Sequence, residues 1–377
     1  MTDLERMALL PEGLRDDLPV AAAFEAAIVD RLLRHFAGFG YERVKPPLVE
    51  FEDSLLAGTG AGLAPQTFRL MDPVSQRMMA VRADMTPQIA RIAQSRLSKA
   101  PRPLRLSYAG DVLRVRGSQL RPERQFVQVG AELIGVAAVA ADAEIVQMAA
   151  EALTAVGVKR LSVDLALPTL VPAVAAGLGL DAATASAART ALDHKDGPAL
   201  AGLPSPAREL MRGLLDATGP ADRAAAALVA LALPSAAAAL AREAEALVAM
   251  LRAALPDLAL TLDPGEHRGF EYQTGISMTL FAKGVRGELG RGGRYALESG
   301  ERATGFTLYM DSLARALPEP KPAQRLYLPH GTPPAVAQAW RAQGWHTVAG
   351  LASGDASAEA RRLGCTHLLA GDTPQQV

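Results

Sequence analysis

Residues 112–135, VLRVRGSQLRPERQFVQVGAELIG, hold the ends of two strand patterns and the arginine-rich segment between them. The first pattern, LRLSYAGDVLRVRG, begins at residue 104, and the second, RQFVQVGAELIG, begins at residue 124. We expect two strands joined by a loop. Gln128 and Glu132 are separated by an even number of residues, so both point to the same face of the second strand. A network of buried side chains that hydrogen-bond to one another explains this polar face, and so does a binding site.

The loop between the two strands is rich in arginine. Arg114, Arg116, Arg121 and Arg124 lie in it or beside it. Guanidinium groups match the oxygens of phosphates and carboxylates, so the loop is a candidate anion site. A solvated basic loop explains the same pattern, and the residues alone leave both interpretations open.

The composition excludes several classes of protein. The 377 residues carry a net charge of -1, so no global basic field favours nucleic acid. A single cysteine, Cys365, excludes an internal disulfide framework and a multi-cysteine zinc site. Asp3, Glu5 and Arg6 precede any apolar run, unlike a signal peptide. We therefore expect a cytoplasmic protein with no membrane span, no metal and no cofactor.

The first 160 residues mix helical and strand patterns. Pro19 opens a helix whose apolar residues Phe24, Ile28, Leu32 and Phe36 share one face. YERVKPPLVEF, residues 41–51, predicts an extended strand, and its two prolines favour a sheet edge or an interface.

The rest of the chain falls into three segments. Residues from about 165 to 255 are rich in alanine and leucine and predict a helical insert, which we interpret as a packing module. Residues 257–317 return to strand and glycine patterns. Residues 318–323, PEPKPA, form a linker before a small α/β unit with parallel strands.

Two motifs in residues 257–317 contain candidate site residues. HRGFEYQTG, residues 267–275, places Arg268 and Tyr272 on one face if it is a strand. An arginine can hold a carboxylate, and a tyrosine hydroxyl can bond an imidazole nitrogen. GELGRGGRY, residues 287–295, predicts a tight turn whose glycines allow close backbone approach to a ligand. Neither motif is specific when taken alone.

In chain order, these segments resemble the histidyl-tRNA synthetase family, which has the class II aminoacyl-tRNA synthetase fold. PEGLRDDLP resembles the family's opening, GYERVKPPLVEFEDSLL its first motif, and residues 112–135 its second motif. GELGRGGRYA with ATGFTLYMDSL resembles the third motif, and HRGFEYQTG resembles the histidine-specific segment. The resemblance implies an α+β fold with an antiparallel sheet flanked by helices. It also implies a core-type domain over residues 1–317 and a shortened anticodon-binding-like unit over 318–377.

The resemblance further implies a site for histidine. Its residues would be Asp84, Thr86, Gln128, Glu132, Arg268 and Tyr272. Asp84 stands where the family has a glutamate that binds the amino group, while Glu132 and Tyr272 match the residues that contact the imidazole. Arg268 matches an arginine near the carboxylate, and Gln273 replaces the second tyrosine of the family's segment.

The part of the site that would bind ATP departs from the family. Arg114 matches an arginine that holds the α-phosphate, but Arg116 replaces a glutamate that accepts from the adenine amine. Ser312 replaces an arginine that holds the terminal phosphate, and Ala296 replaces an aspartate. One hydrogen bond to a charged group contributes about 1.5–3 kcal/mol. These changes therefore predict a chain that keeps an amino-acid site but cannot adenylate the amino acid.

This pattern is similar to that of the regulatory subunits of ATP phosphoribosyltransferase, which are synthetase paralogues. The resemblance implies a short-form catalytic subunit as partner, L-histidine as feedback effector, and a homodimer within a hetero-octamer. It implies that this chain is required for the partner's activity and binds no tRNA. Arg114, Arg116 and Arg124 would then form a residual anion site.

Two other functions fit parts of the sequence. An active histidyl-tRNA synthetase with an unusual ATP site fits the order of the motifs. A sensor of uncharged tRNA fits the basic loop, although the near-zero net charge and the shortened tail oppose it.

Overall fold

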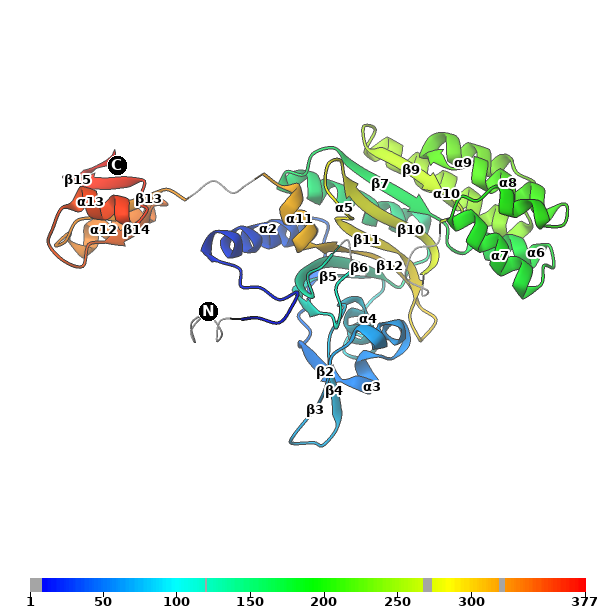
Figure 1. Ribbon diagram of the computed structural model, residues 1–377, viewed down its shortest axis with the longest axis horizontal. Helices are drawn as coiled ribbons and strands as arrows, with labels where there is room; N and C mark the ends of the chain where they lie inside the picture. The colour runs from blue at the N-terminus through cyan, green and yellow to red at the C-terminus, as the bar shows by residue number, and fades with distance from the viewer. Residues whose placement is uncertain (1–8, 119–120, 267–272, 319–322) are drawn as a thin grey trace. The chain divides into compact units, whose positions relative to one another are not determined.

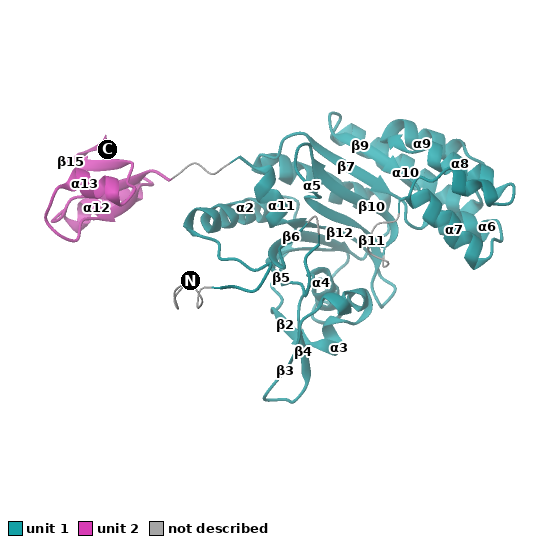
Figure 2. Ribbon diagram, in the orientation of Figure 1, with its two compact units in different colours: residues 1–318 teal, residues 319–377 magenta. Residues whose placement is uncertain are grey.

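The computed structural model describes residues 9–118, 121–266, 273–318 and 323–377 (Figure 1). The chain divides into two compact units, residues 1–318 and 319–377 (Figure 2). Two predicted site residues, Arg268 and Tyr272, lie outside the described residues. Within the described ranges, no helix has both the length and the apolar character needed to cross a bilayer.

A nine-stranded sheet forms the centre of the first unit. From edge to edge its strands are β1 (Glu42–Arg43), β5 (Leu104–Leu113), β6 (Gln125–Ile134), β12 (Arg302–Tyr309), β11 (Gly290–Ala296), β10 (Gln273–Ala282), β7 (Leu161–Ala166), β9 (Ala259–Asp263) and β8 (Gly219–Pro220). All pairs from β5 to β7 are antiparallel, whereas β1 pairs with β5, and β7 with β9, in parallel. This arrangement confirms the predicted α+β fold with an antiparallel sheet.

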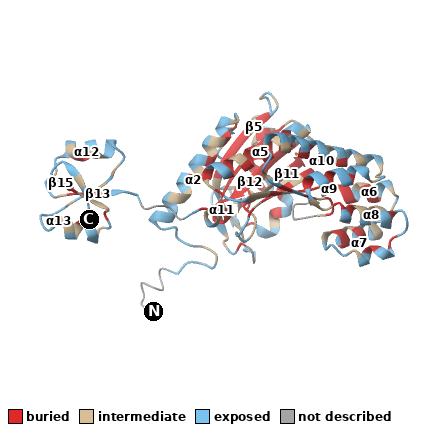
Figure 3. Ribbon diagram, turned by 90° about the horizontal axis from the view of Figure 1, so that it is seen from above, coloured by how far each residue is buried: buried red, intermediate tan, exposed pale blue. Residues whose placement is uncertain are grey.

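One face of the sheet is covered by three long helices: α2 (Pro19–Gly38), α5 (Val139–Val156) and α10 (Ser235–Ala254) (Figures 1 and 3). The predicted stripe of α2 is confirmed, because Ile28, Leu32 and Phe36 are buried. Phe36 meets Phe306 of β12 edge to face, with ring centroids 5.3 Å apart. Helix α5 ends at Gly157, whose left-handed φ of 112° favours glycine.

The opposite face carries the smaller elements that build the pocket. They are α3 (Glu52–Leu55), the 3-10 segment η1 (Gly58–Gln66), α4 (Thr86–Ser95) and a sheet of β2 (Val49–Phe51), β4 (Met78–Val81) and β3 (Arg69–Met71). Buried Arg82 donates to the carbonyl oxygens of Asp111, Pro46 and Pro47. It thereby connects the two-proline segment to β5.

The prolines split the predicted strand at residues 41–51 into two. β1 lies at the edge of the large sheet, as expected, but β2 belongs to the three-stranded sheet. Proline has no N–H to donate, so neither ladder can continue through Pro46 and Pro47.

The prediction of a tight turn for the glycine-rich segment is wrong for most of its residues, because Gly290–Ala296 form strand β11 and only residues 287–289 belong to the connection before it. The strand residues pair with β10 on one side and β12 on the other. Gly293 has a φ of +149°, and a Cβ there would lie 2.8 Å from the carbonyl oxygen of Ile276. Glycine is therefore needed to fit the strand closely beside β10, and not to reverse the chain.

The predicted helical insert is confirmed between β7 and β9. It consists of α6 (Leu170–Gly177), α7 (Ala182–Asp193), η2 (Pro198–Gly202), α8 (Ala207–Asp216), α9 (Ala221–Ala230) and α10, with the short strand β8 before α9. Alanines and leucines of these helices join the main apolar core, which explains their abundance.

The second unit contains a four-stranded sheet of β14 (His346–Ala349), β13 (Arg325–Leu328), β15 (His367–Ala370) and β16 (Thr373–Gln376). Helices α12 (Pro334–Ala342) and α13 (Ala356–Arg362) connect its parallel strands. The expected parallel strands are confirmed, and the antiparallel β16 was not predicted.

Candidate functional site

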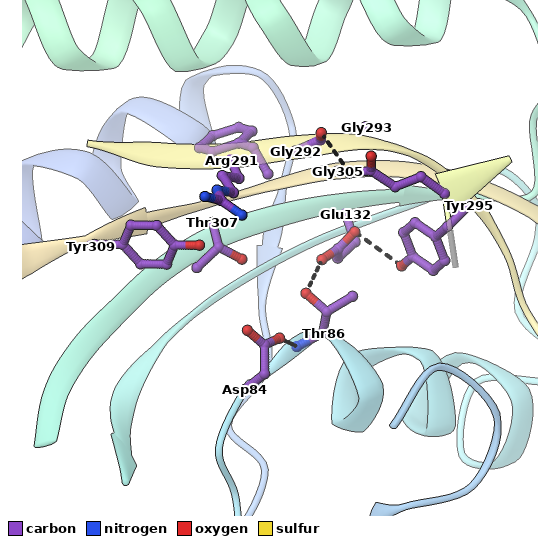
Figure 4. Close-up of a pocket in the computed structure, with 12 residues that line it drawn as sticks. Asp84, Thr86, Glu132, Arg291, Gly292, Gly293, Tyr295, Gly305, Thr307 and Tyr309 are labelled. Atoms are coloured by element: carbon purple, nitrogen blue, oxygen red, sulfur yellow. Dashed lines mark hydrogen bonds between the residues drawn. The ribbon is translucent and has the colours of Figure 1, made fainter. Parts of the chain in front are cut away.

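A pocket lies on the α4 face of the large sheet, under β6, β12 and β11 (Figure 4). It contains about 380 Å³ of space between atoms, part of which is open solvent. The polar side chains that line it include Asp84, Thr86, Glu132, Arg291, Tyr295 and Tyr309. We call this space the inner pocket.

The alternation of β6 determines what reaches the pocket. Val129, Ala131 and Leu133 face the core under α2 and α5. Gln128 and Glu132 lie on the other face, as their even spacing predicted, and are 0% and 1% exposed. Burial of two polar side chains requires partners, and both have them.

The segment before α4 forms one side of the inner pocket, and Gln128, which does not itself line the pocket, holds that segment from behind. Gln128 Nε2 donates to Asp84 Oδ2 at 2.8 Å, and Gln128 Oε1 accepts from the backbone N–H of Met85 at 2.9 Å. Asp84 Oδ1 accepts from the N–H of Thr86 at 2.9 Å. Each carboxylate oxygen can accept a second hydrogen bond. Asp84 can therefore also accept from a ligand ammonium group.

Glu132 forms the other side, with its carboxyl group held by three hydroxyls. Thr86 Oγ1 and the Tyr108 hydroxyl donate to Oε1 at 3.0 Å and 3.3 Å. The Tyr295 hydroxyl donates to Oε2 at 3.0 Å. Gly305 lies opposite Glu132 in the β6–β12 ladder, and its missing side chain leaves room for this carboxyl group. The site can thus bind a ring that both donates and accepts hydrogen bonds.

The buried Glu132 carboxyl group takes up a proton more readily than usual. Burial raises its pKa from 4.5 to about 8, although the hydroxyls of Tyr295 and Thr86 oppose the shift. Near neutral pH the group can donate a hydrogen bond as well as accept one.

This shift predicts a pH-dependent stability that Glu132→Gln removes. In the folded chain Glu132 keeps its proton up to about pH 8, whereas in the unfolded chain it loses the proton near the ordinary 4.5. Its contribution to the free energy of unfolding is therefore complete below pH 4.5 and is lost as pH rises to about 8. The steepest loss is about 1.4 kcal/mol per pH unit. Urea unfolding of both chains from pH 5 to 8.5 should show the variant gaining stability relative to the original chain. A pH-independent difference between them contradicts the prediction.

A second cavity adjoins the inner pocket, with about 760 Å³ of space between atoms, part of which is open solvent. Arg291 and Tyr309 line both, and we call this second space the outer cavity. Arg114 and Arg121 also line it. Arg121 is 8% exposed, and its guanidinium lies 3.7 Å from the centre of the Tyr309 ring. The outer cavity therefore combines cations with an aromatic wall.

Acidic groups of the chain itself already pair with the cations of the outer cavity. Arg121 Nε lies 3.2 Å from Asp311 Oδ2, and its Nη2 lies 3.6 Å from Glu288 Oε1. Arg291 Nη2 lies 2.6 Å from Glu288 Oε2. The internal pairs reduce the positive potential available to a polyphosphate.

The three predicted anion-binding arginines lie in different environments. Arg114 lines the outer cavity. Arg124 donates to the carbonyl oxygens of Arg114 and Glu12 and lies over the ring of Phe68, a set of contacts that fixes the loop. Arg116 is exposed. Their anion-binding role stays a prediction, as does the histidine-binding role of Asp84, Thr86, Gln128, Glu132, Arg268 and Tyr272.

The structure adds three residues that sequence reasoning missed: Tyr108, Tyr295 and Arg291. Tyr108 lies on β5, and only the pairing of β5 with β6 brings its hydroxyl to Glu132. Tyr295 and Arg291 lie in the segment predicted as a turn. Its strand alternation, with Arg291, Gly293 and Tyr295 at every second position, was the available signal. Among the described residues, no group of three or more His, Cys, Asp or Glu side chains could hold a metal ion.

Comparison with known proteins first defines the class. The family model described as histidyl-tRNA synthetase matches residues 13–313. A histidyl-tRNA synthetase from Nostoc sp. has the same fold, with a TM-score of 0.80, 19% identity, and coverage of 96% of this chain and 90% of that one. A Bacillus halodurans structure described as an ATP phosphoribosyltransferase regulatory subunit/histidyl-tRNA synthetase gives a TM-score of 0.83 at 25% identity, covering 94% and 96% of the two chains. The first unit is a class II synthetase-like domain.

Comparison with related proteins identifies the family within this class. The chain belongs to the family of ATP phosphoribosyltransferase regulatory subunits. It is 58% identical to the member from Paramagnetospirillum magneticum over 373 residues, covering 99% of this chain and 98% of that protein. It is also 58% identical to the member from Rhodospirillum centenum, with coverage of 98% and 97%.

Proposed function

We propose that this chain is a non-catalytic regulatory subunit that a short-form ATP phosphoribosyltransferase catalytic subunit requires for the first step of histidine biosynthesis. In this proposal histidine binds the inner pocket and thereby inhibits the partner. The observation that carries the proposal is that Asp84, which Gln128 holds in place, and Glu132 line the same pocket.

The chemistry of the two sides suits histidine. The Asp84 carboxylate can bind the ligand's ammonium group. Glu132 and the hydroxyls around it can meet the two imidazole nitrogens, of which one donates and one accepts in the neutral ring. Tyr272 and Arg268 complete this proposed set, at the imidazole and the carboxylate respectively.

The outer cavity supports a non-catalytic role. Ser312, where the resemblance expects an arginine, is 1% exposed and accepts from Arg315 Nη2 at 3.1 Å. Arg121 is paired with Asp311 and Glu288. A triphosphate would have to compete with these carboxylates, which weakens ATP binding.

An active histidyl-tRNA synthetase is the second candidate, favoured by the family model that matches residues 13–313. Histidine-dependent exchange between ATP and pyrophosphate distinguishes the two functions. The proposed regulatory subunit shows no exchange above background.

Histidine bound to this chain can regulate the catalytic partner only if the two subunits are thermodynamically linked. Histidine can inhibit the partner only by binding one state of the complex more tightly than another.

We further propose that this chain forms a dimer within a hetero-octamer, and that residues 1–317 and 318–377 act as core and anticodon-binding-like domains. The proposal includes no cofactor and no tRNA.

Formation of phosphoribosyl-ATP by the cognate catalytic subunit, with and without this chain, tests the proposed function. We expect little product from the catalytic subunit alone, activation on mixing, and loss of that activation as L-histidine is added. Glu132→Gln should weaken inhibition by histidine more than it weakens activation. No activation on mixing overturns the regulatory role, and activation insensitive to histidine overturns the sensing role.

A further inference from the structure

We propose that Arg291 recognises the free α-carboxylate of the ligand and makes the inner pocket selective for a free amino acid. This inference rests on the proposed function, because it concerns the same histidine site. It adds a residue that the sequence comparison with the synthetase family did not point to.

The strand geometry puts Arg291 and the ring-binding residues on one surface. Arg291 and Tyr295 differ by four positions in β11, so their side chains share the pocket face at a Cα separation of about 13 Å. Gly293 stands between them and contributes no side chain. In Figure 4 the Arg291 guanidinium group lies next to Thr307, away from the Glu132–Tyr295 contact. In the proposed complex the body of the amino acid lies between these two groups.

The charged side chains of the inner pocket indicate where the ammonium and the carboxylate of that amino acid bind. Asp84 and Glu132 are the acidic groups that line it, and Arg291 is the only arginine or lysine among its described lining residues. A zwitterion brings one ammonium and one carboxylate, and a carboxylate buried without a partner is costly. Asp84 can take the ammonium, and Arg291 is the described cation that can meet the carboxylate, in addition to the proposed Arg268.

Glu288 prepares Arg291 for this task. Its Oε2 accepts from Arg291 Nη2 at 2.6 Å, and the two side chains are 15% and 25% exposed. This contact offsets part of the charge of Arg291, but it also orients the planar guanidinium group, whose remaining nitrogens can still meet a single carboxylate. A lysine at position 291 would keep the charge but not the fork.

Calorimetric titration of the full-length chain with L-histidine and L-histidinol tests the inference, because histidinol has a hydroxymethyl group in place of the carboxylate. The original chain should bind histidine about 10- to 100-fold more tightly than histidinol, as expected for one charge-assisted contact. Arg291→Met should lower histidine affinity to the level of histidinol and leave histidinol affinity unchanged. Arg291→Lys should recover part of the preference.

Three comparisons make the outcomes distinguishable. Arg286→Met removes an exposed arginine just before β11 and should preserve the preference. If Arg291→Met keeps the preference while Arg268→Met abolishes it, this inference is wrong and the histidine site remains. If Arg291→Met weakens binding of ATP or inorganic phosphate but not of histidine, Arg291 serves the outer cavity and the inference is also wrong. If the original chain binds neither histidine nor histidinol, the proposed sensing function fails as well.

Discussion

Gly305→Ala is expected to weaken histidine binding by about 100-fold or more and to abolish inhibition by histidine. A Cβ on residue 305 would lie 1.8 Å from Glu132 Oε2 and 2.5 Å from its Cδ. Both residues lie in the middle of paired strands, and the carbonyl oxygen of Ala131 is 2.7 Å from the same Cβ. The Glu132 carboxyl group must therefore leave its hydroxyl partners. Each lost hydrogen bond costs about 0.5–1.5 kcal/mol, a buried polar group left without a partner costs about 1–3 kcal/mol, and overpacking reduces stability by about 1–3 kcal/mol.

Titration with histidine and the inhibition curve of the reconstituted complex measure this effect. Gly62→Ala is the matched control, because an added Cβ there meets nothing within 4 Å. The control should bind histidine like the original chain. Unchanged histidine affinity in Gly305→Ala would show that the ligand does not use Glu132 in the position described.

The fold class was predicted from the resemblance to the synthetase family, whereas one strand face and one helix stripe were predicted for a physical reason. The even spacing of Gln128 and Glu132 is a local property of one strand, so it could be read directly. The stripe of α2 is likewise local. The partners of Glu132 are not, because Tyr108, Tyr295 and Gly305 come from three other strands whose register only the folded sheet defines.

The glycine-rich segment shows a second limit on sequence-based prediction. Glycine favours turns, and the run at residues 287–295 has four glycines, so a turn was the natural expectation. In the folded chain these residues lie between β10 and β12, and close approach requires the missing side chains. The pairing of Arg121 with Asp311 could not be foreseen either, because only the folded chain brings together two residues so far apart in the sequence.

Arg294→Met is expected to lower the free energy of unfolding of the first unit by about 3–5 kcal/mol, the usual cost of breaking a buried ion pair from one side. Arg294 lies on the face of β11 opposite the pocket and pairs with Asp142 of α5, which is 3% exposed. It also donates to Glu243 of α10 at 2.7 Å. Burial raises the pKa of Asp142, and Arg294 opposes that shift. Without the arginine, Asp142 is left as a buried acid with no cation.

Urea unfolding can separate the two units because both tryptophans, Trp340 and Trp345, lie in the second unit. The helical circular dichroism signal, which comes mostly from the first unit, should shift to lower urea, while tryptophan fluorescence should not.

Two control variants identify the cause of that shift. Arg34→Met breaks a pair with Asp30 whose side chains are 71% and 66% exposed, and should change stability by less than about 0.5 kcal/mol. Combining Arg294→Met with Asp142→Leu replaces the buried pair by apolar groups and should restore most of the loss, since such replacements are often neutral. If the double variant is no more stable than Arg294→Met, the loss comes from the contact with Glu243 and the helical insert, and not from an isolated buried charge.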